Sequence, residues 1–359
     1  MHQAHGPRTR RGIGGHLQVT TGLASAAHKW QDVNQILRTN KIGGIWLQET
    51  HLMNTAAETL NTQFEGKIQI FNTPDKTNPA GVAGTAVVLN CRLTRWEKVT
   101  EELIILGRAL MVSLPWRDTD KMIRILSVYA LNCDEEIATF WTTLRTTFTG
   151  QNPKPKPNIV LGDFNNVEEA TDCLPPRPDP NTKIKELRNL KTALNIIDGW
   201  RDEHPTELAY TWKPSQSQLT QNRCSRSRID RIYISQELYP NTCDWNIEEN
   251  TIGSDHQRPV ATIYDPGSAE QGEGRWGMPT DLARNKTVLR EIAQSTVEIL
   301  REARRCTGDQ RTDTENPQSK LEAFKDVVVE KIHKIAKLRV SKTKQRIEDL
   351  RRQRDHILN

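Results

Sequence analysis

The sequence predicts an α/β protein in which strands and helices pack in layers, and three observations support this. From about Trp30 to Tyr264, short runs rich in β-branched residues alternate with stretches of helical periodicity. Strands interleaved with helices are typical of layered α/β architectures. Beyond Asp265 the strand-like runs stop and only helical periodicity remains. The chain of 359 residues is long enough for one large domain or two ordinary ones.

The predicted strands are short apolar runs separated by helices or loops. They lie at residues 45–48, 82–89, 122–129, 158–161 and 228–234. The predicted helices carry apolar side chains at helical spacing. They lie at residues 29–39, after Asp134 with Ile137, Phe140, Leu144 and Phe148, and around Ile184, Leu187, Leu190 and Leu194. The proline-rich residues 152–157 form a stiff connector, because proline cannot continue a helix.

A change of composition near Asp265 predicts a domain boundary. Residues 265–274 have the Gly, Ser and Glu composition of a linker, and amphipathic helices are predicted at 286–305 and 320–358. The second helix has ten Lys or Arg between residues 331 and 354, which fits a solvated face or a nucleic-acid contact. The predicted divisions are a disordered or unreliable N-terminus (1–16), a main α/β domain (17–264), a linker (265–279) and a helical extension (280–359).

Composition excludes several classes of protein. The net charge of +5 permits a polyanionic partner without requiring one. The six cysteines have no Cys-x-x-Cys spacing, which argues against a zinc site and against a disulfide framework. No apolar run approaches the roughly 20 residues that span a bilayer, and no secretory signal is present. The sequence therefore predicts a soluble, intracellular protein that is not secreted.

An acidic residue on an apolar strand face is the strongest single clue to function. In residues 228–234, the two-residue alternation places Asp230 on the same face as Ile232 and Ile234, and Arg231 on the opposite, outward face. A buried carboxylate needs a cation, a donor or a wet cleft. A structural salt bridge with a nearby arginine is the alternative interpretation.

Three further motifs place polar residues at the ends of apolar strands. The run Ile159–Leu161 ends at Gly162 and is followed by Asp163 and Asn165, which can hold a water molecule and a phosphate, or can simply form a turn. Glu49 follows the strand at 45–48 and suits a hard divalent cation, or is an exposed loop residue. Tyr129 closes another strand and is a core residue or a phosphate contact.

The pair Asp255-His256 is the last motif. Asp255 can orient the imidazole of His256 and favour its protonated form, which can bind or protonate a phosphate oxygen. A surface pair without a function is the alternative.

The order of these motifs resembles the endonuclease/exonuclease/phosphatase superfamily, which includes apurinic-site endonucleases. It is most similar to the endonuclease domain that begins the second open reading frame of LINE-type (non-LTR) retrotransposons of the fungal kind. The similarity extends from about Trp30 to Ile263 and rests on five phrases. They are KWQDVNQ at 29–35, LQETH at 47–51, GDFN at 162–165, SRSRIDR at 225–231 and SDH at 254–256. Residues 274–276 and the helix around Phe324 resemble the segment that joins this domain to a reverse transcriptase, and the chain stops before any polymerase motif.

The resemblance implies a fold, a reaction and a set of roles. The implied fold is a four-layer α/β sandwich of two packed mixed sheets flanked by helices. The implied reaction is hydrolysis of a DNA phosphodiester that leaves a 3′-hydroxyl and a 5′-phosphate, with Mg²⁺ (or Mn²⁺) as cofactor. It further implies a nuclear location, DNA as partner and the element's RNA as a further candidate. The implied metal ligands are Glu49 and Asp255, and the implied catalytic residues are Tyr129, Asp163, Asn165, Asp230, Asp255 and His256.

Basic residues near the Asp230 strand are candidate phosphate contacts. Arg223, Arg226 and Arg228 lie at the edge expected to face DNA. Two departures from the family pattern are evident. Residues 17–22 lack the asparagine usual in the first strand, and Leu131 stands where proline is usual. A catalytically inactive nucleic-acid-binding remnant, or an enzyme acting on RNA or a phosphomonoester, therefore stays open as an alternative.

Overall fold

The computed structural model describes residues 16–23, 29–116, 121–214, 225–249, 254–264, 285–305, 311–312 and 314–358. It divides into two compact units, Met1–Gly272 and Glu273–Asn359, which are described separately below. The division lies inside the segment 265–279 that the sequence predicts as a linker, and those residues are outside the described part of the chain.

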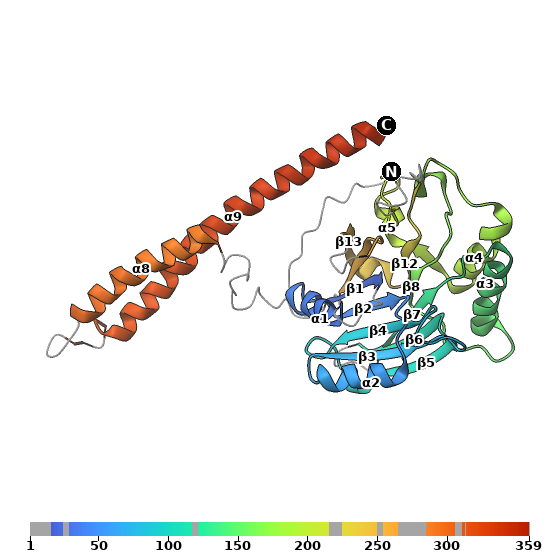
Figure 1. The fold of residues 1–359 in the computed structure, drawn as a ribbon, viewed down its shortest axis with the longest axis horizontal. Coiled ribbons are helices and arrows are strands. Elements are labelled where there is room, and N and C mark those ends of the chain that lie inside the picture. Colours follow the sequence, from blue (N-terminus) through green and yellow to red (C-terminus); the bar gives the residue numbers. More distant parts are fainter. Residues whose placement is uncertain are drawn as a thin grey trace. The chain divides into compact units, whose positions relative to one another are not determined.

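The first unit is built on two stacked six-stranded sheets (Figure 1). The first sheet has the order β13 (Thr242–Glu248), β14 (Arg258–Tyr264), β1 (His16–Leu23), β2 (Gly44–Gln48), β4 (Thr85–Asn90), β3 (Ile68–Thr73). The second has the order β10 (Ile196–Asp198), β12 (Asp230–Ser235), β8 (Ile159–Asp163), β7 (Met122–Tyr129), β6 (Ala109–Pro115), β5 (Thr100–Ile105). Both sheets are mixed, because β1 pairs with β2 in parallel and β7 with β8 in parallel, while their other pairings are antiparallel.

Helices cover the outer face of each sheet (Figure 1). On the first sheet, α1 (Lys29–Thr39) and α2 (Asn54–Gln63) enclose a core that includes Val33, Leu37 and Ile45. On the second sheet, α3 (Asp134–Thr149) and α4 (Asn181–Leu194) enclose a core with Trp141 and Leu187. A third core, between the sheets, includes Trp46, Leu161 and Ile232. The predicted four-layer sandwich is confirmed.

Short elements complete the first unit. They are η1 (Trp96–Lys98), η2 (Ala170–Asp172), β9 (Cys173–Leu174), α5 (Gly199–Glu203), β11 (Arg226–Ser227) and η3 (Tyr239–Asn241). Strands β9 and β11 pair with each other in antiparallel fashion. This small ribbon lies at the start of β12 and therefore next to the motif that contains Asp230.

Two predicted elements agree with the structure residue by residue, and several strands begin later than predicted. The helix at 29–39 and the strand at 122–129 have the predicted bounds. The strand predicted at 82–89 begins at Thr85, because Ala83 and Gly84 have positive φ angles of 51° and 91° that an extended strand cannot adopt.

Strand β12 is buried on both faces. Ile232 and Ile234 face the core between the sheets, as predicted from the alternation, and Tyr233 faces the core under α3 and α4. The expectation that Arg231 points outward is wrong, because its side chain is fully buried and ion-paired with Asp172. A strand in the middle of a covered sheet has no outward face.

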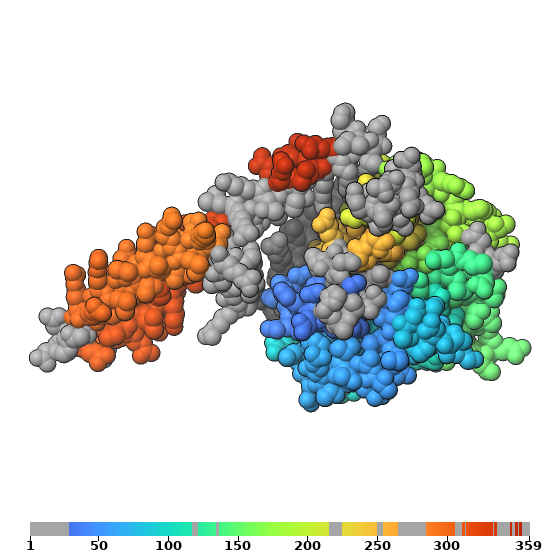
Figure 2. Space-filling model, viewed as in Figure 1, coloured from blue at the N-terminus to red at the C-terminus, as the bar shows by residue number. Residues whose placement is uncertain are grey.

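The second unit is a helical hairpin of α8 (Lys286–Arg305) and α9 (Pro317–Leu358). Val288 of α8 and Ile332 of α9 form its buried contact, and Figure 2 shows α8 in orange lying along α9. Among the described residues, no helix has the length and apolarity needed to cross a membrane.

Candidate active site

Two motif residues follow their strands in a left-handed backbone conformation. Glu49 comes directly after β2 with a φ of 49°, and Asn165 comes two residues after β8 with a φ of 46°. Such angles are uncommon outside glycine and cost about 1–3 kcal/mol, so they persist only where the surroundings enforce them. Both side chains thereby turn into the same cleft, rather than continuing the alternation of their strands.

The motif at the end of β8 begins with Gly162, and the backbone geometry at this position requires glycine. Its φ is 138°, and a Cβ atom on this residue would lie 1.9 Å from the carbonyl oxygen of Val128. Gly162 pairs with Val128 across β7 and β8. Only glycine permits this close approach, which sets where the next residue, Asp163, leaves the strand.

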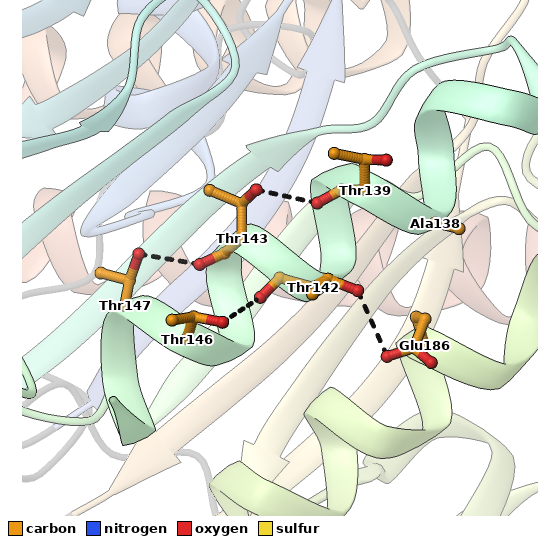
Figure 3. A pocket seen from close by; sticks show the side chains of 7 residues that line it. All are labelled: Ala138, Thr139, Thr142, Thr143, Thr146, Thr147 and Glu186. Carbon is orange, nitrogen blue, oxygen red and sulfur yellow. Dashed lines mark hydrogen bonds between the residues drawn. The ribbon is translucent and has the colours of Figure 1, made fainter. Parts of the chain in front are cut away.

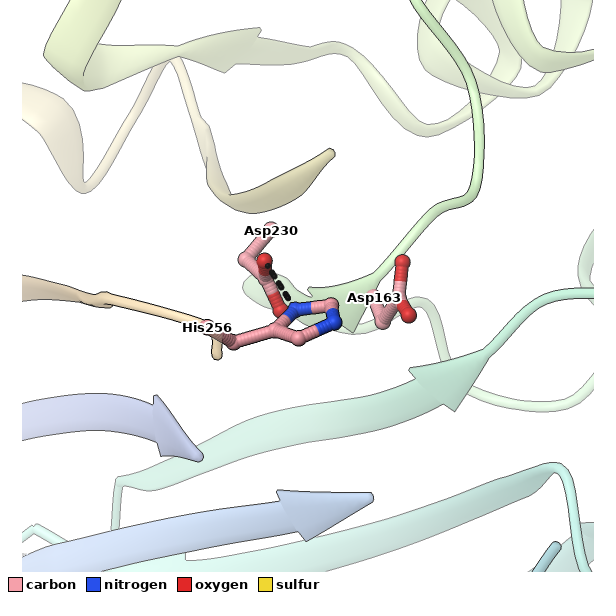
Figure 4. A group of neighbouring side chains, drawn as sticks. All are labelled: Asp163, Asp230 and His256. Atoms are coloured by element: carbon pink, nitrogen blue, oxygen red, sulfur yellow. Dashed lines mark hydrogen bonds and ion pairs between the residues drawn. The ribbon is translucent and has the colours of Figure 1, made fainter. Parts of the chain in front are cut away.

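Asp163, Asp230 and His256 form the centre of the site (Figure 4). Asp163 and Asp230 are opposite each other in the register of β8 and β12, and both are almost completely buried. The Nδ1 atom of His256 lies 2.8 Å from Oδ2 of Asp230. Each of the three residues has a ligand atom within 4.8 Å of the others. Figure 4 shows the second ring nitrogen of His256 turned toward Asp163.

The charges in this cluster shift two pKa values in the same direction. Burial of the imidazole opposes its charge, but the carboxylate of Asp230 outweighs burial and raises the pKa of His256 to about 10. Burial, reinforced by the negative charge of Asp230, raises the pKa of Asp163 to about 7. At neutral pH, His256 is therefore a cation, while Asp163 can gain or lose a proton.

Tyr129 joins Glu49 to the cluster. The Tyr129 hydroxyl donates a hydrogen bond to Oε1 of Glu49, and the Arg108 guanidinium lies 4.5 Å from the centre of the Tyr129 ring. Burial, together with Glu49, raises the pKa of Tyr129, so the phenol stays protonated and remains a donor. Asn165 is also held in place, because its side-chain amide donates to the Ala130 carbonyl over 2.9 Å.

One cleft of about 490 Å³ receives these groups. Its lining residues are Glu49, Tyr129, Asn132, Asp163, Asn165, Val167, Asp179, Lys183, Trp212, Ser227, Ile229, Asp255 and His256. Asp230 lies behind His256 and acts on the cleft through it. The structure thus brings all seven predicted catalytic and metal-binding residues together.

A second hollow, on the surface between α3 and α4, lacks comparable chemistry (Figure 3). It is lined by threonines and by Glu186. The hydroxyls of Thr143 and Thr147 donate to the backbone carbonyl four residues earlier in α3, and that of Thr142 donates to Glu186. These donors are already used within the protein, so we place the site in the cleft.

A comparison of the whole sequence with known protein families agrees with the placement of the site in this cleft. The family model described as Endonuclease/Exonuclease/phosphatase family matches residues 45–256, more than half of the chain. The chain belongs to the endonuclease/exonuclease/phosphatase family. The matched segment begins in β2, four residues before Glu49, and ends at His256. It therefore contains every catalytic and metal-binding residue predicted from the motifs.

One protein relative and two solved structures illustrate the family. The relative is the "Transposon TX1 uncharacterized 149 kDa protein" of Xenopus laevis, 29% identical over 208 residues; the match covers 57% of this chain and 15% of the relative. The 3′ phosphatase NExo from Neisseria, bound to a product DNA hairpin, has a TM-score of 0.52 and 20% identity, covering 69% of this chain and 99% of NExo. The endonuclease domain of TRAS1, a telomere-specific non-LTR retrotransposon, has a TM-score of 0.50 and 15% identity, covering 69% of this chain and 98% of that domain. At these identities, the structures show a shared fold.

The structure corrects one of the predicted nucleic-acid contacts. Arg228 cannot contact DNA, because its side chain is 2% exposed and is paired with Asp172 and Asp198 at 2.8 Å each. These carboxylates belong to a buried ionic network that also includes Arg231. Arg226 is exposed on β11, and its role stays a prediction. Arg223 lies outside the described residues.

Sequence reasoning missed several residues of this family site. Asn132, Asp179 and Lys183 line the cleft from loops and from the first turn of α4. Thr211 and Trp212 lie next to Asp230 and Asp255. None of the five occupies an apolar strand or a recognisable motif, so neither periodicity nor spacing could have revealed them.

The donor set of the cleft fits a hard divalent cation. Glu49, Asp163 and Asp255 present carboxylates to one cleft, and buried Asp163 is crowded by Asp230. Mg²⁺ is bound in proteins by one or two carboxylates with water and phosphate oxygens, which matches this composition. None of the described residues that line the cleft is a cysteine, and carboxylate ligands favour a hard cation over a soft one.

Proposed function

We propose that this chain is a metal-dependent DNA endonuclease, the nicking domain of a LINE-type retrotransposon protein that acts on nuclear DNA. The proposed reaction is hydrolysis of a phosphodiester that leaves a 3′-hydroxyl and a 5′-phosphate. Support comes from family membership, from a relative named as a transposon protein and from the fold shared with a retrotransposon endonuclease domain.

The single observation that carries the proposal is the His256–Asp230 pair facing Asp163 within an acidic cleft. A phosphodiester needs a charged donor for its oxygens and a base for the attacking water. His256, held as a cation by Asp230, serves as the donor. Asp163, whose pKa is raised to about 7, accepts the proton of the water molecule.

The remaining groups orient the phosphate and the water. The Asn165 side chain, fixed by its bond to the Ala130 carbonyl, positions the nucleophile beside Asp163. The protonated Tyr129 hydroxyl contacts the phosphate or its leaving oxygen when Glu49 takes another partner. Glu49 and Asp255 are the proposed ligands of Mg²⁺, which when bound supplies Lewis-acid stabilisation of the developing negative charge.

Two basic residues are the proposed contacts to neighbouring phosphates. Lys183 lines the cleft and is oriented by Asp179, with Nζ 3.4 Å from its carboxylate. Arg226 lies exposed on the ribbon beside the cleft. Such contacts add affinity that depends on salt and little on sequence.

A plasmid-nicking assay with Mg²⁺ tests the proposal. We expect the protein to convert supercoiled DNA to the nicked circle, and Asp163→Ala and His256→Ala to lower the rate at least about 1000-fold. Glu186→Ala, in the hollow between α3 and α4, is the matched acidic control and should nick at the normal rate. If the protein nicks no faster than Asp163→Ala, it is an inactive nucleic-acid-binding remnant instead.

Two further experiments test the proposed substrate and the effect of the missing asparagine in β1. Faster cleavage of an abasic duplex, RNA or a phosphomonoester than of plasmid DNA would replace the proposed substrate. Val19→Asn and Thr20→Asn restore an amide in β1, where the family usually has asparagine. A gain in nicking would mean that activity has decayed through this strand.

A further inference from the structure

Residues 211–213 pass between the two segments that supply Asp230 and His256. On one side, the backbone amides of Thr211 and Trp212 donate to the Ser227 carbonyl over 3.0 and 2.8 Å, and Ser227 donates back to Trp212 over 3.1 Å. On the other side, the amide of Gln257 donates to the Thr211 carbonyl over 2.5 Å. Trp212 forms isolated β-bridges with both Ser227 and His256. This short segment therefore links the approach to β12 with the loop before β14.

The Thr211 side chain holds the first residues of β12. Thr211 is completely buried, and its Oγ1 atom accepts hydrogen bonds from the backbone amides of Ile229 over 3.0 Å and Asp230 over 2.9 Å. The Ile229 carbonyl in turn accepts from the amide of Phe164 over 2.9 Å. One hydroxyl thus sets the backbone that carries Asp230, and through Ile229 the loop that carries Asp163.

The Trp212 side chain binds the segment that carries Asp255 and His256. Its indole Nε1 donates to Oδ2 of Asp255 over 3.2 Å, and the ring lines the cleft. Asp255 immediately precedes His256, whose own amide donates to Ser254 Oγ over 3.0 Å. The indole therefore fixes the turn from which the imidazole reaches Asp230.

We propose that Thr211 and Trp212 are positioning residues that set the Asp230–His256 hydrogen bond, an inference that rests on the proposed nuclease function for its kinetic consequence. The two side chains act on adjacent residues of opposite segments, and their shared backbone ties those segments together. Loss of either one displaces Asp230 or His256 relative to the substrate phosphate. Displacements of about 1 Å in such groups lower rates on the order of 100-fold.

Thr211→Val and Thr211→Ser separate positioning from simple structural support. Valine keeps the shape of threonine but leaves the Ile229 and Asp230 amides without their acceptor, whereas serine keeps the hydroxyl. We expect Thr211→Val to lower kcat about 10- to 100-fold with KM for DNA changed less than about threefold. Thr211→Ser should keep kcat within about threefold of the natural protein.

Thr242 provides a matched control. It is a nearly buried threonine whose hydroxyl donates to the Tyr239 carbonyl and accepts from the Trp245 indole. It pairs with Ile263, near the far end of β14 from His256. Thr242→Val should leave kcat unchanged. The proposal is overturned if Thr211→Val keeps full kcat, or if Thr242→Val lowers kcat as much as Thr211→Val does.

A spectroscopic measurement tests the same idea without activity. The hydrogen-bonded Nδ1 proton of His256 should give a downfield imidazole resonance in ¹⁵N-histidine-labelled protein, and Asp230→Asn identifies it by abolishing it. We expect Thr211→Val to shift or abolish this resonance and Thr242→Val to leave it in place. If the natural protein does not nick DNA, the nuclease proposal fails while this resonance still decides whether Thr211 positions the pair.

Trp212→Phe is the second variant, and it serves if Thr211→Val does not fold. Phenylalanine keeps an aromatic wall in the cleft but lacks the N–H that Asp255 accepts. We expect a lowered kcat and a shifted His256 resonance in this folded protein. If both stay as in the natural protein, Trp212 has no positioning role and that half of the proposal is overturned.

Discussion

Asp230→Asn is the most informative perturbation of this site, because it removes one charge and almost no volume. In the natural protein, the Asp230 carboxylate lies 2.8 Å from Nδ1 of His256 and raises the pKa of the imidazole to about 10. The amide of asparagine carries no charge to offset the burial of the ring. The carboxylates of Asp163 and Asp255 still favour the charged ring, so we expect the pKa of His256 in this variant to fall well below about 10, toward its ordinary value near 6.5.

The shift has a calculable effect on stability. The pKa of His256 rises from 6.5 to about 10 on folding, and such a shift corresponds to at most roughly 5 kcal/mol. Because the folded pKa is the higher one, this stabilisation is fully present below about pH 6.5 and is lost as the pH rises through about 10. Asp230→Asn should therefore destabilise the protein most at about pH 6.5 and below, and progressively less toward pH 10.

Urea unfolding between about pH 6 and pH 10 measures the effect, with ¹⁵N NMR of the histidines to follow His256 directly. Glu207→Gln is the matched control, since it removes a carboxylate 3.1 Å from the more exposed His204. Exposed ion pairs contribute little, so this variant should leave the pH dependence unchanged. A natural protein whose His256 titrates near pH 6.5, or a variant with an unchanged profile, would refute the reasoning.

Three further predictions concern the rest of the site. Gly162→Ala should cost more than about 2 kcal/mol in urea unfolding, because its Cβ would clash with the Val128 carbonyl. Gly66→Ala, at a φ of 67° with open space around it, should cost only about 1–2 kcal/mol, and equal losses would contradict the clash. Mg²⁺ should raise Tm more at about pH 8 than at about pH 5, since the ionised carboxylate of Asp163 in the same cleft favours a cation and its pKa is raised to about 7; an equal rise at both pH values would argue against a metal beside Asp163. Lys183→Ala should reduce the salt slope of DNA binding by about one, with an unchanged slope excluding a phosphate contact. Arg228→Ala should leave the slope unchanged but cost about 3–5 kcal/mol in unfolding, because it breaks a buried ionic network.

Individual strands and helices, and the motif residues at their ends, were predictable because their signals are local. A run of apolar residues predicts strand β7, and apolar residues at helical spacing predict helix α1. The bounds of both elements were predicted correctly. The motif residues Glu49 and Asp163 stand at strand ends, where a change from apolar to acidic is visible in the sequence. The pairing of Asp230 with Asp163, in contrast, depends on the register of β12 and β8, which no local pattern specifies.

The prediction that Arg228 contacts DNA was wrong because its partners, too, are set by the fold and not by a local pattern. Arginine beside a catalytic strand suggests a phosphate contact, but the same charge serves equally well to neutralise buried carboxylates. Asp172 and Asp198, which pair with Arg228, lie 56 and 30 positions earlier in the chain and belong to no motif. Thr211 escaped prediction for a related reason. A buried hydroxyl that accepts two backbone amides has no sequence signature, because its partners are defined only by the fold.

The departure in the first strand bears on activity rather than on architecture. Although residues 17–22 lack the family's asparagine, β1 pairs in parallel with β2 and antiparallel with β14, as an inner strand of the first sheet. Backbone pairing does not require the missing side chain, so the strand survives its loss. The His256–Asp230 pair and Asp163 come from the loop before β14 and from the second sheet. Val19→Asn and Thr20→Asn therefore change a side chain while the backbone pairing of β1 is kept, so a gain in nicking would report on the site and not on the fold.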